Sequence, residues 1–255
     1  LRSFTIIKTP NSSDLYKHLN TPSTSHAQIT IGDFYYLCLM QPKEAHCPVK
    51  ELPSTKKTLR FAYQSGMPPS FNPHYSFGDI RCQILNKLLF EGLTRLNEQG
   101  MPELAGAIAM QQDGLCYTFK LRPYRWSNGE HVTALDYVSS WRGALSDCIN
   151  HPELLFVIKN AQEYKEKKCP FSEVAVKALD AETLQIQLQW PDPYFLHKLA
   201  QPFFSPLFGS LREPKWFNGP YLIREQTEEK ILLERNPYFW DAERIYFDQI
   251  EMRKE

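Results

Sequence analysis

The chain has 255 residues, of which 42% are hydrophobic and 13% aromatic, and its 29 basic residues balance 29 acidic ones. This length and apolar content suffice for one large or two small globular domains, and they exclude a disordered chain. A formal net charge of zero gives no electrostatic support for binding nucleic acid or an anionic membrane.

Residues 1–57 show no apolar periodicity, and the stretch from Asn11 to Gln28 is rich in Ser, Thr and Asn. This composition predicts a divergent, poorly ordered N-terminal segment. The apolar stretch from Ile29 to Met40 is too short to span a bilayer and contains Asp33. It therefore predicts neither a membrane helix nor a convincing signal peptide.

A helix is predicted after Asp79, because a carboxylate at this position can accept hydrogen bonds from the first backbone N–H groups. Its apolar face carries Ile80, Ile84 and Leu88. Farther along, Cys116 to Leu121 alternates apolar and polar residues, which is typical of a half-buried strand.

A turn and a second helix should follow that strand. Asn128 and Gly129 favour the turn, and Thr133 with Asp136 three residues later is typical of a capped helix start. The apolar side chains at helical spacing are Val138, Trp141 and Leu145. We expect Trp141 to be buried together with Tyr117, Phe119 and Trp126.

The remaining elements alternate irregularly between helix and strand, which predicts a mixed α/β (α+β) fold without a regular βαβ repeat. In chain order they are a polar surface helix over Asn160 to Lys168, a strand over Thr183 to Trp190, a helix over Tyr194 to Ala200, a hairpin of Tyr221 to Arg224 with Ile231 to Glu234, and a strand over Tyr246 to Met252.

The wording of residues 113–142, DGLCYTFKLRPYRWSNGEHVTALDYVSSWR, resembles the signature segment of extracytoplasmic solute-binding proteins of family 5, which serve peptide and nickel ABC transporters. Further matches occur in the order of the family and cover most of the chain from Lys57 to Glu255. They include FNPH at 71–74, LLFEGL at 88–93, IKNAQEY at 158–164 and NGPYLI at 218–223.

The resemblance implies a periplasmic-binding-protein-like fold of type II. It maps residues 58–89 and 194–255 to a partial first lobe, and residues 90–193 to a smaller second domain packed on that lobe. Family members continue beyond the equivalent of Glu255 into an opposite lobe that helps to hold the ligand. The chain therefore resembles the amino-terminal half of a member, and the lobes are expected to be incomplete.

The resemblance also implies a function. The expected ligands are oligopeptides, the expected partners are ABC-transporter permease subunits in the membrane, and the expected location is the periplasm or cell envelope. No cofactor, catalytic activity or nucleic-acid partner is implied. The alternative is a truncated paralogue that binds no peptide, or an interaction module of the same fold.

Two segments are expected to line the binding site by this resemblance. One is the loop after the NPH turn, and the other precedes the IKNA motif; together they comprise Tyr75, Ser76, Phe77, Gly78 and Asp79, and His151 and Glu153. An apolar contact from Phe77 and close backbone approach at Gly78 fit a ligand loop. A helix-capping turn fits the first segment equally well. At the second, an aromatic peptide contact of the family is replaced by His151, Pro152 and Glu153.

Motifs for catalysis or metal binding are not found in the sequence. The scattered histidines, expected in turns or at the surface, are His74, His131, His151 and His197. The cysteines lack zinc-ligand spacing and are expected to be small buried residues, with disulfide pairing left open; they are Cys38, Cys47, Cys82, Cys116, Cys148 and Cys169. The tryptophans expected to pack in the core are Trp126, Trp141, Trp190 and Trp240.

Overall fold

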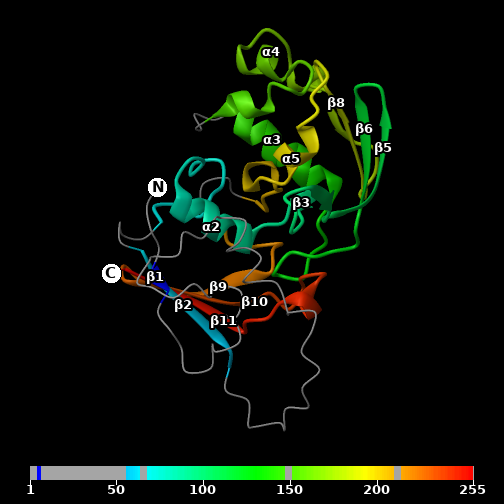
Figure 1. Cartoon of the computed structure of the whole chain (residues 1–255). Coiled ribbons are helices and arrows are strands. Elements are labelled where there is room, and N and C mark those ends of the chain that lie inside the picture. The colour runs from blue at the N-terminus through cyan, green and yellow to red at the C-terminus, as the bar shows by residue number, and fades with distance from the viewer. Residues whose placement is uncertain (1–4, 7–55, 64–67, 147–150, 210–213, 255) are drawn as a thin grey trace.

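The computed structural model describes residues 5–6, 56–63, 68–146, 151–209 and 214–254. They form the mixed α/β fold that the sequence predicts, with two main sheets at opposite ends and helices between them (Figure 1). Within these ranges, none of the helices has the combined length and apolar character that crossing a membrane requires.

The first sheet combines segments from both ends of the chain in the order β1-β2-β11-β10-β9. Strands β2 and β11 run parallel, and the other neighbours are antiparallel. Lys57 fixes the register, because its N–H donates to Asp248 Oδ2 at 2.8 Å and its carbonyl accepts from the N–H of Asp248 at 2.8 Å. The strands are β1 (Thr5–Ile6), β2 (Thr58–Tyr63), β9 (Tyr221–Gln226), β10 (Lys230–Arg235) and β11 (Gln249–Lys254).

Helix α2 (Ile80–Leu89) lies over this sheet (Figure 1). Its buried face and the inner faces of the strands form one hydrophobic cluster, here called the first-sheet core, whose members include Phe61, Leu85, Leu88, Tyr221, Leu233 and Ile250. The predicted helix face is largely correct, although Ile80 at the N-terminus is 38% exposed.

The second sheet is fully antiparallel, in the order β5-β6-β8-β7. Helix α3 (Ala134–Ser146) contacts β7 and β8. The strands are β5 (Ala107–Asp113), β6 (Cys116–Leu121), β7 (Val176–Ala178) and β8 (Thr183–Gln187). Strand β6 has the predicted bounds.

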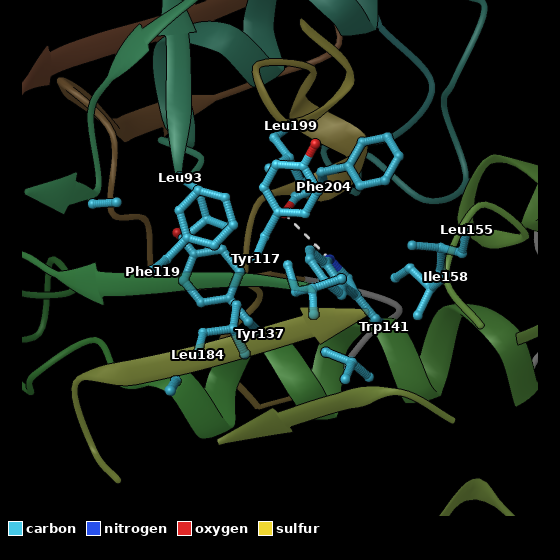
Figure 2. Packing of buried hydrophobic residues seen from close by; sticks show 14 of the residues in the cluster. Leu93, Tyr117, Phe119, Tyr137, Trp141, Leu155, Ile158, Leu184, Leu199 and Phe204 are labelled. Carbon is cyan, nitrogen blue, oxygen red and sulfur yellow. Dashed lines mark hydrogen bonds between the residues drawn. The ribbon is translucent and has the colours of Figure 1, made fainter. Parts of the chain in front are cut away.

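A second hydrophobic cluster, the second-sheet core, lies between this sheet and its helices (Figure 2). As predicted, it contains Tyr117, Phe119, Trp126 and Trp141, all buried. Trp141 Nε1 donates to the carbonyl of Phe204 at 3.2 Å, the bond drawn in Figure 2. This bond ties α3 to a segment 63 residues later.

The start of α3 confirms the predicted cap. The carboxylate of Asp136 accepts from the backbone N–H of Thr133 at 2.7 Å and from its hydroxyl at 3.0 Å. In the preceding turn, Gly129 has φ +89°, a conformation that favours glycine.

Trp240 joins the two clusters, because it packs against both. The guanidinium carbons of Arg122 and Arg95 lie 3.6 and 5.0 Å from the centroid of its ring. Arg95 also forms ion pairs with Glu103 at 2.7 Å and Asp241 at 2.9 Å. Arg95 and Glu103 belong to the short hairpin of β3 (Thr94–Leu96) and β4 (Pro102–Leu104).

Glu91 is buried at the same seam, and its side chain is 3% exposed. Its Oε2 lies 3.9 Å from Nη1 of Arg95, and no group of the described residues hydrogen-bonds to that oxygen. Burial raises the pKa of Glu91 to about 7, against the opposing effect of Arg95 and with a further contribution from Asp241.

The remaining elements are short. They are α4 (Ala161–Lys165), α5 (Phe195–Leu199) and the 3₁₀ helices η2 (Pro152–Leu155), η3 (Phe171–Glu173), η4 (Pro202–Phe204) and η5 (Ala242–Arg244). Helix α4 is shorter than predicted, and Lys167 just beyond it has φ +61°, which no α-helix accommodates.

Two predicted strand boundaries differ from the structure by three residues, and one predicted core residue is wrong. Strand β8 ends at Gln187 rather than at residue 190, because its partner β6 begins opposite Gln187, at Cys116. Trp190 lies beyond this pairing and is 48% exposed, so it does not pack in the core. Strand β11 begins three residues later than predicted, since the carbonyls of Tyr246 and Phe247 accept hydrogen bonds from Arg235.

Other predictions are tested only in part. The poorly ordered segment predicted over residues 1–57 lies mostly outside the described residues, although β1 pairs with β2. Cys38, Cys47 and Cys148 also lie outside them, whereas the free thiols are buried Cys82 and half-buried Cys116 and Cys169. The division into lobes stays a prediction; Phe195, Leu199, Phe203 and Phe204 pack in the second-sheet core.

Candidate functional site

The loop predicted to contact ligand is built on a hydrogen-bonded turn at Asn72. Its side-chain Oδ1 accepts from the N–H of His74 at 2.9 Å, and its carbonyl accepts from the hydroxyl of Ser76 at 2.7 Å. Asn86 of α2 donates to Ser76 Oγ at 2.9 Å. Asn72, His74, Ser76 and Asn86 are all buried. The turn is therefore fixed to the helix that follows it, and Ser76 serves that attachment rather than the surface.

His74 lies in the turn, as predicted, and its side chain is fully buried. Its Nε2 lies 3.0 Å from the carbonyl oxygen of Phe203, and the two rings meet edge to face with centroids 5.0 Å apart. Burial lowers the pKa of His74 to about 4, although the bond to Phe203 acts in the opposite direction. A histidine held neutral in this way is a structural group at neutral pH.

Phe77 connects the two predicted site segments. Its ring centroid lies 5.3 Å from that of His151 and 5.8 Å from that of Phe203, with edge-to-face geometry in both contacts. Phe77 and the neighbouring Tyr75 are half-buried against the second-sheet core. The structure thus brings the loop after the NPH turn next to the segment at residue 151.

Gly78 and Asp79 end the loop and start α2. Gly78 has φ +94° and is exposed. Asp79 caps the helix, because its Oδ1 accepts from the N–H of Arg81 at 2.9 Å and from Nε of Arg81 at 3.0 Å. Its Oδ2 accepts from Arg81 Nη2 at 2.6 Å, and these side-chain bonds lower the pKa of Asp79. The capping interpretation of this segment is therefore correct for Asp79.

His151 and Glu153 form an exposed pair beside Phe77. Nδ1 of His151 lies 2.8 Å from Oε1 of Glu153, and the side chains are 49% and 57% exposed. His151 has φ +62° and precedes η2. The backbone N–H of Glu153 itself and the bond with His151 lower the pKa of Glu153. The imidazole presents an aromatic edge to Phe77, two residues before Glu153, where the aromatic contact of the family is expected to be lost.

These groups form an aromatic and polar surface. The carboxylate of Asp79 is engaged by Arg81, and within the described ranges no three His, Cys, Asp or Glu residues are placed to hold a metal ion. Sequence reasoning missed the roles of His74 and Phe203. The available signal was the NPH turn itself, since a histidine directly after Asn-Pro is held by the turn and can be directed inward.

Comparison with known proteins identifies relatives. The model of the family described as bacterial extracellular solute-binding proteins, family 5 (middle), matches residues 99–254. The oligopeptide-binding protein OppA of Bacillus subtilis is 35% identical over 203 residues, which cover 72% of this chain and 37% of that protein. The periplasmic oligopeptide-binding protein OppA of Escherichia coli is 32% identical over 198 residues, covering 71% and 36%.

Solved structures agree with the sequence matches. Listeria monocytogenes OppA bound to peptide superposes with a TM-score of 0.74 at 28% identity, over 79% of this chain and 43% of that one. Haemophilus influenzae OppA in complex with the peptide RPPGFSPFR gives a TM-score of 0.72 at 26% identity, over 79% and 42%. The chain thus spans less than half the length of these relatives. The chain belongs to the bacterial extracellular solute-binding proteins of family 5.

Proposed function

We propose that the chain is the peptide-binding component of an ABC transporter, holding extended oligopeptides and delivering them to permease subunits in the membrane of the cell envelope. The observation that carries this proposal is the superposition on peptide-bound OppA from Listeria monocytogenes, at a TM-score of 0.74. The relatives are binding proteins, which favours a role without catalysis.

The proposed contact surface comprises Tyr75 to Asp79 with His151 and Glu153. Phe77 and His151 supply apolar and aromatic edges, Gly78 leaves the backbone accessible, and Glu153 supplies an exposed acceptor. Edges of this kind accept varied side chains, while backbone groups of an extended peptide find their partners in the protein or in water. The proposed lobe division, with residues 58–89 and 194–255 on one side and 90–193 on the other, puts Phe77 and His151 in different units.

Calorimetry with a mixture of short peptides tests the proposal. We expect Phe77→Ala to weaken peptide binding about tenfold, which corresponds to about 1.4 kcal/mol, because it removes the ring that contacts His151. The control is Leu179→Ala, an apolar side chain 54% exposed near the second sheet, which should leave affinity unchanged. A folded chain that binds none of the peptides would support the interaction module instead. Unchanged affinity in Phe77→Ala would show that peptides bind at a different surface.

A further inference from the structure

Phe203 of η4 is held from two sides by the turn that precedes α2. The rings of His74 and Phe203 meet edge to face, with centroids 5.0 Å apart. Nε2 of His74 also lies 3.0 Å from the carbonyl oxygen of Phe203. Phe77 reaches the same ring at 5.8 Å. His74 and Phe203 are 129 positions apart in the sequence, so their contact brings together distant parts of the chain.

The chemistry of that bond assigns the tautomer of His74. A carbonyl oxygen can only accept, so Nε2 must carry the proton and Nδ1 must be the unprotonated nitrogen. Within the described part of the chain, no group hydrogen-bonds to Nδ1. The backbone of His74 is fixed independently, because its N–H donates to Asn72 at 2.9 Å. His74 is thus held at its backbone and at Nε2, whose N–H is directed at the carbonyl of Phe203.

We propose that His74 is a positioning residue for the candidate binding surface: it fixes Phe203, and Phe203 in turn holds Phe77 against His151. This inference rests on the proposed function only for its effect on peptide binding. The positioning itself concerns side chains of the free protein, so it is testable without ligand. Glutamine can keep a donor near Nε2 but has no ring, whereas phenylalanine keeps the ring edge but has no donor.

The tautomer is tested on the wild-type protein. Nitrogen-15 NMR of the imidazoles should show one histidine with protonated Nε2 and unprotonated Nδ1 and without titration above about pH 5, because full burial opposes its charging. The signal is assigned by its loss in His74→Gln. If His74 instead carries its proton on Nδ1 or titrates near its ordinary pKa, the proposal is wrong.

Positioning is tested through His151, whose Hε1 resonance should be shifted by the ring of Phe77, since the two centroids lie 5.3 Å apart. We expect His74→Phe and His74→Gln each to move this resonance toward the position found in Phe77→Ala. The control is Tyr137→Phe, which removes a buried hydrogen bond of 3.0 Å to Tyr124 and leaves the hydrogen bond and ring contact between His74 and Phe203 in place. An unmoved His151 resonance in both folded His74 variants would overturn the proposal.

Peptide affinity provides the second readout, measured well below the thermal midpoint of each variant. Both His74 variants should bind mixed peptides about tenfold more weakly than Tyr137→Phe. If the wild type binds no peptide, the proposed function fails while the His151 shift still decides the positioning. If peptides bind and the His74 variants match Tyr137→Phe in affinity, His74 is a core residue only and the inference fails.

Discussion

At the scale of single residues, the most informative group outside the candidate site is Glu91. Arg95 lies closer to Glu103 and Asp241, at 2.7 and 2.9 Å, than to Glu91, at 3.9 Å. The positive charge at the seam is therefore shared among three carboxylates, and the buried one receives the smallest part. A buried carboxylate without a close partner retains its proton more strongly than one in water.

Replacing Glu91 by Gln should make the protein's stability less dependent on pH. The pKa of Glu91 is raised from about 4.5 to about 7, so the folded state holds a proton there that the unfolded state releases. The associated stability is complete below about pH 4.5 and is lost as the pH rises through about 7. Urea unfolding should show wild type losing about 3 kcal/mol relative to Glu91→Gln across this window.

His74 titrates in both proteins, so its contribution cancels in that difference. The charged neighbours that decide the slope are Arg95, Arg122, Asp241 and Glu103. Parallel stability curves for wild type and Glu91→Gln would show that the pKa of Glu91 is the same in the folded and unfolded states.

At the scale of elements, the sequence predicts correctly those elements whose causes lie in residues close to one another in the chain. Strand β6 and the capped start of α3 follow from alternation and from the pair Thr133 and Asp136, which lie three residues apart in the chain. The end of β8 and the start of β11 depend instead on where a partner strand begins, which no local pattern records. The candidate site shows the same limit. The resemblance to the family's sequence motifs pointed to Phe77 and His151. Their contact and the burial of His74 arise only from tertiary packing.

Two substitutions of Asp79 separate the stability that it contributes as the N-cap of α2 from the stability that its ion pair with Arg81 contributes. Asp79→Ala removes both the cap and the pairing with Arg81, whereas Asp79→Asn retains a capping oxygen and loses only the charge. We expect Ala to lower the free energy of unfolding by about 1 kcal/mol and Asn by a few tenths, since a partly exposed ion pair contributes little. Equal losses in urea unfolding of the two variants would mean that the cap has no energetic role.

At the scale of the whole molecule, the chain before residue 56 should contribute little to stability. Only Thr5 and Ile6 of that segment are described, and they pair with Phe61 and Ala62 at the edge of the first sheet. A protein that begins at Lys56 keeps Lys57 and its two bonds to Asp248. Its thermal midpoint should lie within about 5 °C of the full chain.

Differential scanning calorimetry of the two proteins checks this expectation. A larger decrease would show that the N-terminal segment packs on the fold. The truncated protein also leaves β2 as a bare sheet edge, so self-association that rises with concentration should accompany the truncation, and a Lys substitution at Thr58 should suppress it.

Because β2 pairs with β11, the first sheet can be completed only after the strands of the second sheet have been synthesised. Strands β5 to β8 and helix α3 have all emerged once the ribosome has made Gln187, and the last member of their core is Phe204. Strand β2 and helix α2 are made earlier, yet β2 has only the two-residue strand β1 as a partner until Gln249 to Lys254 are made. The apolar faces of β2 and α2 therefore stay largely uncovered until strands β9 to β11 have been made. These two elements are consequently the part of the nascent chain most dependent on chaperones.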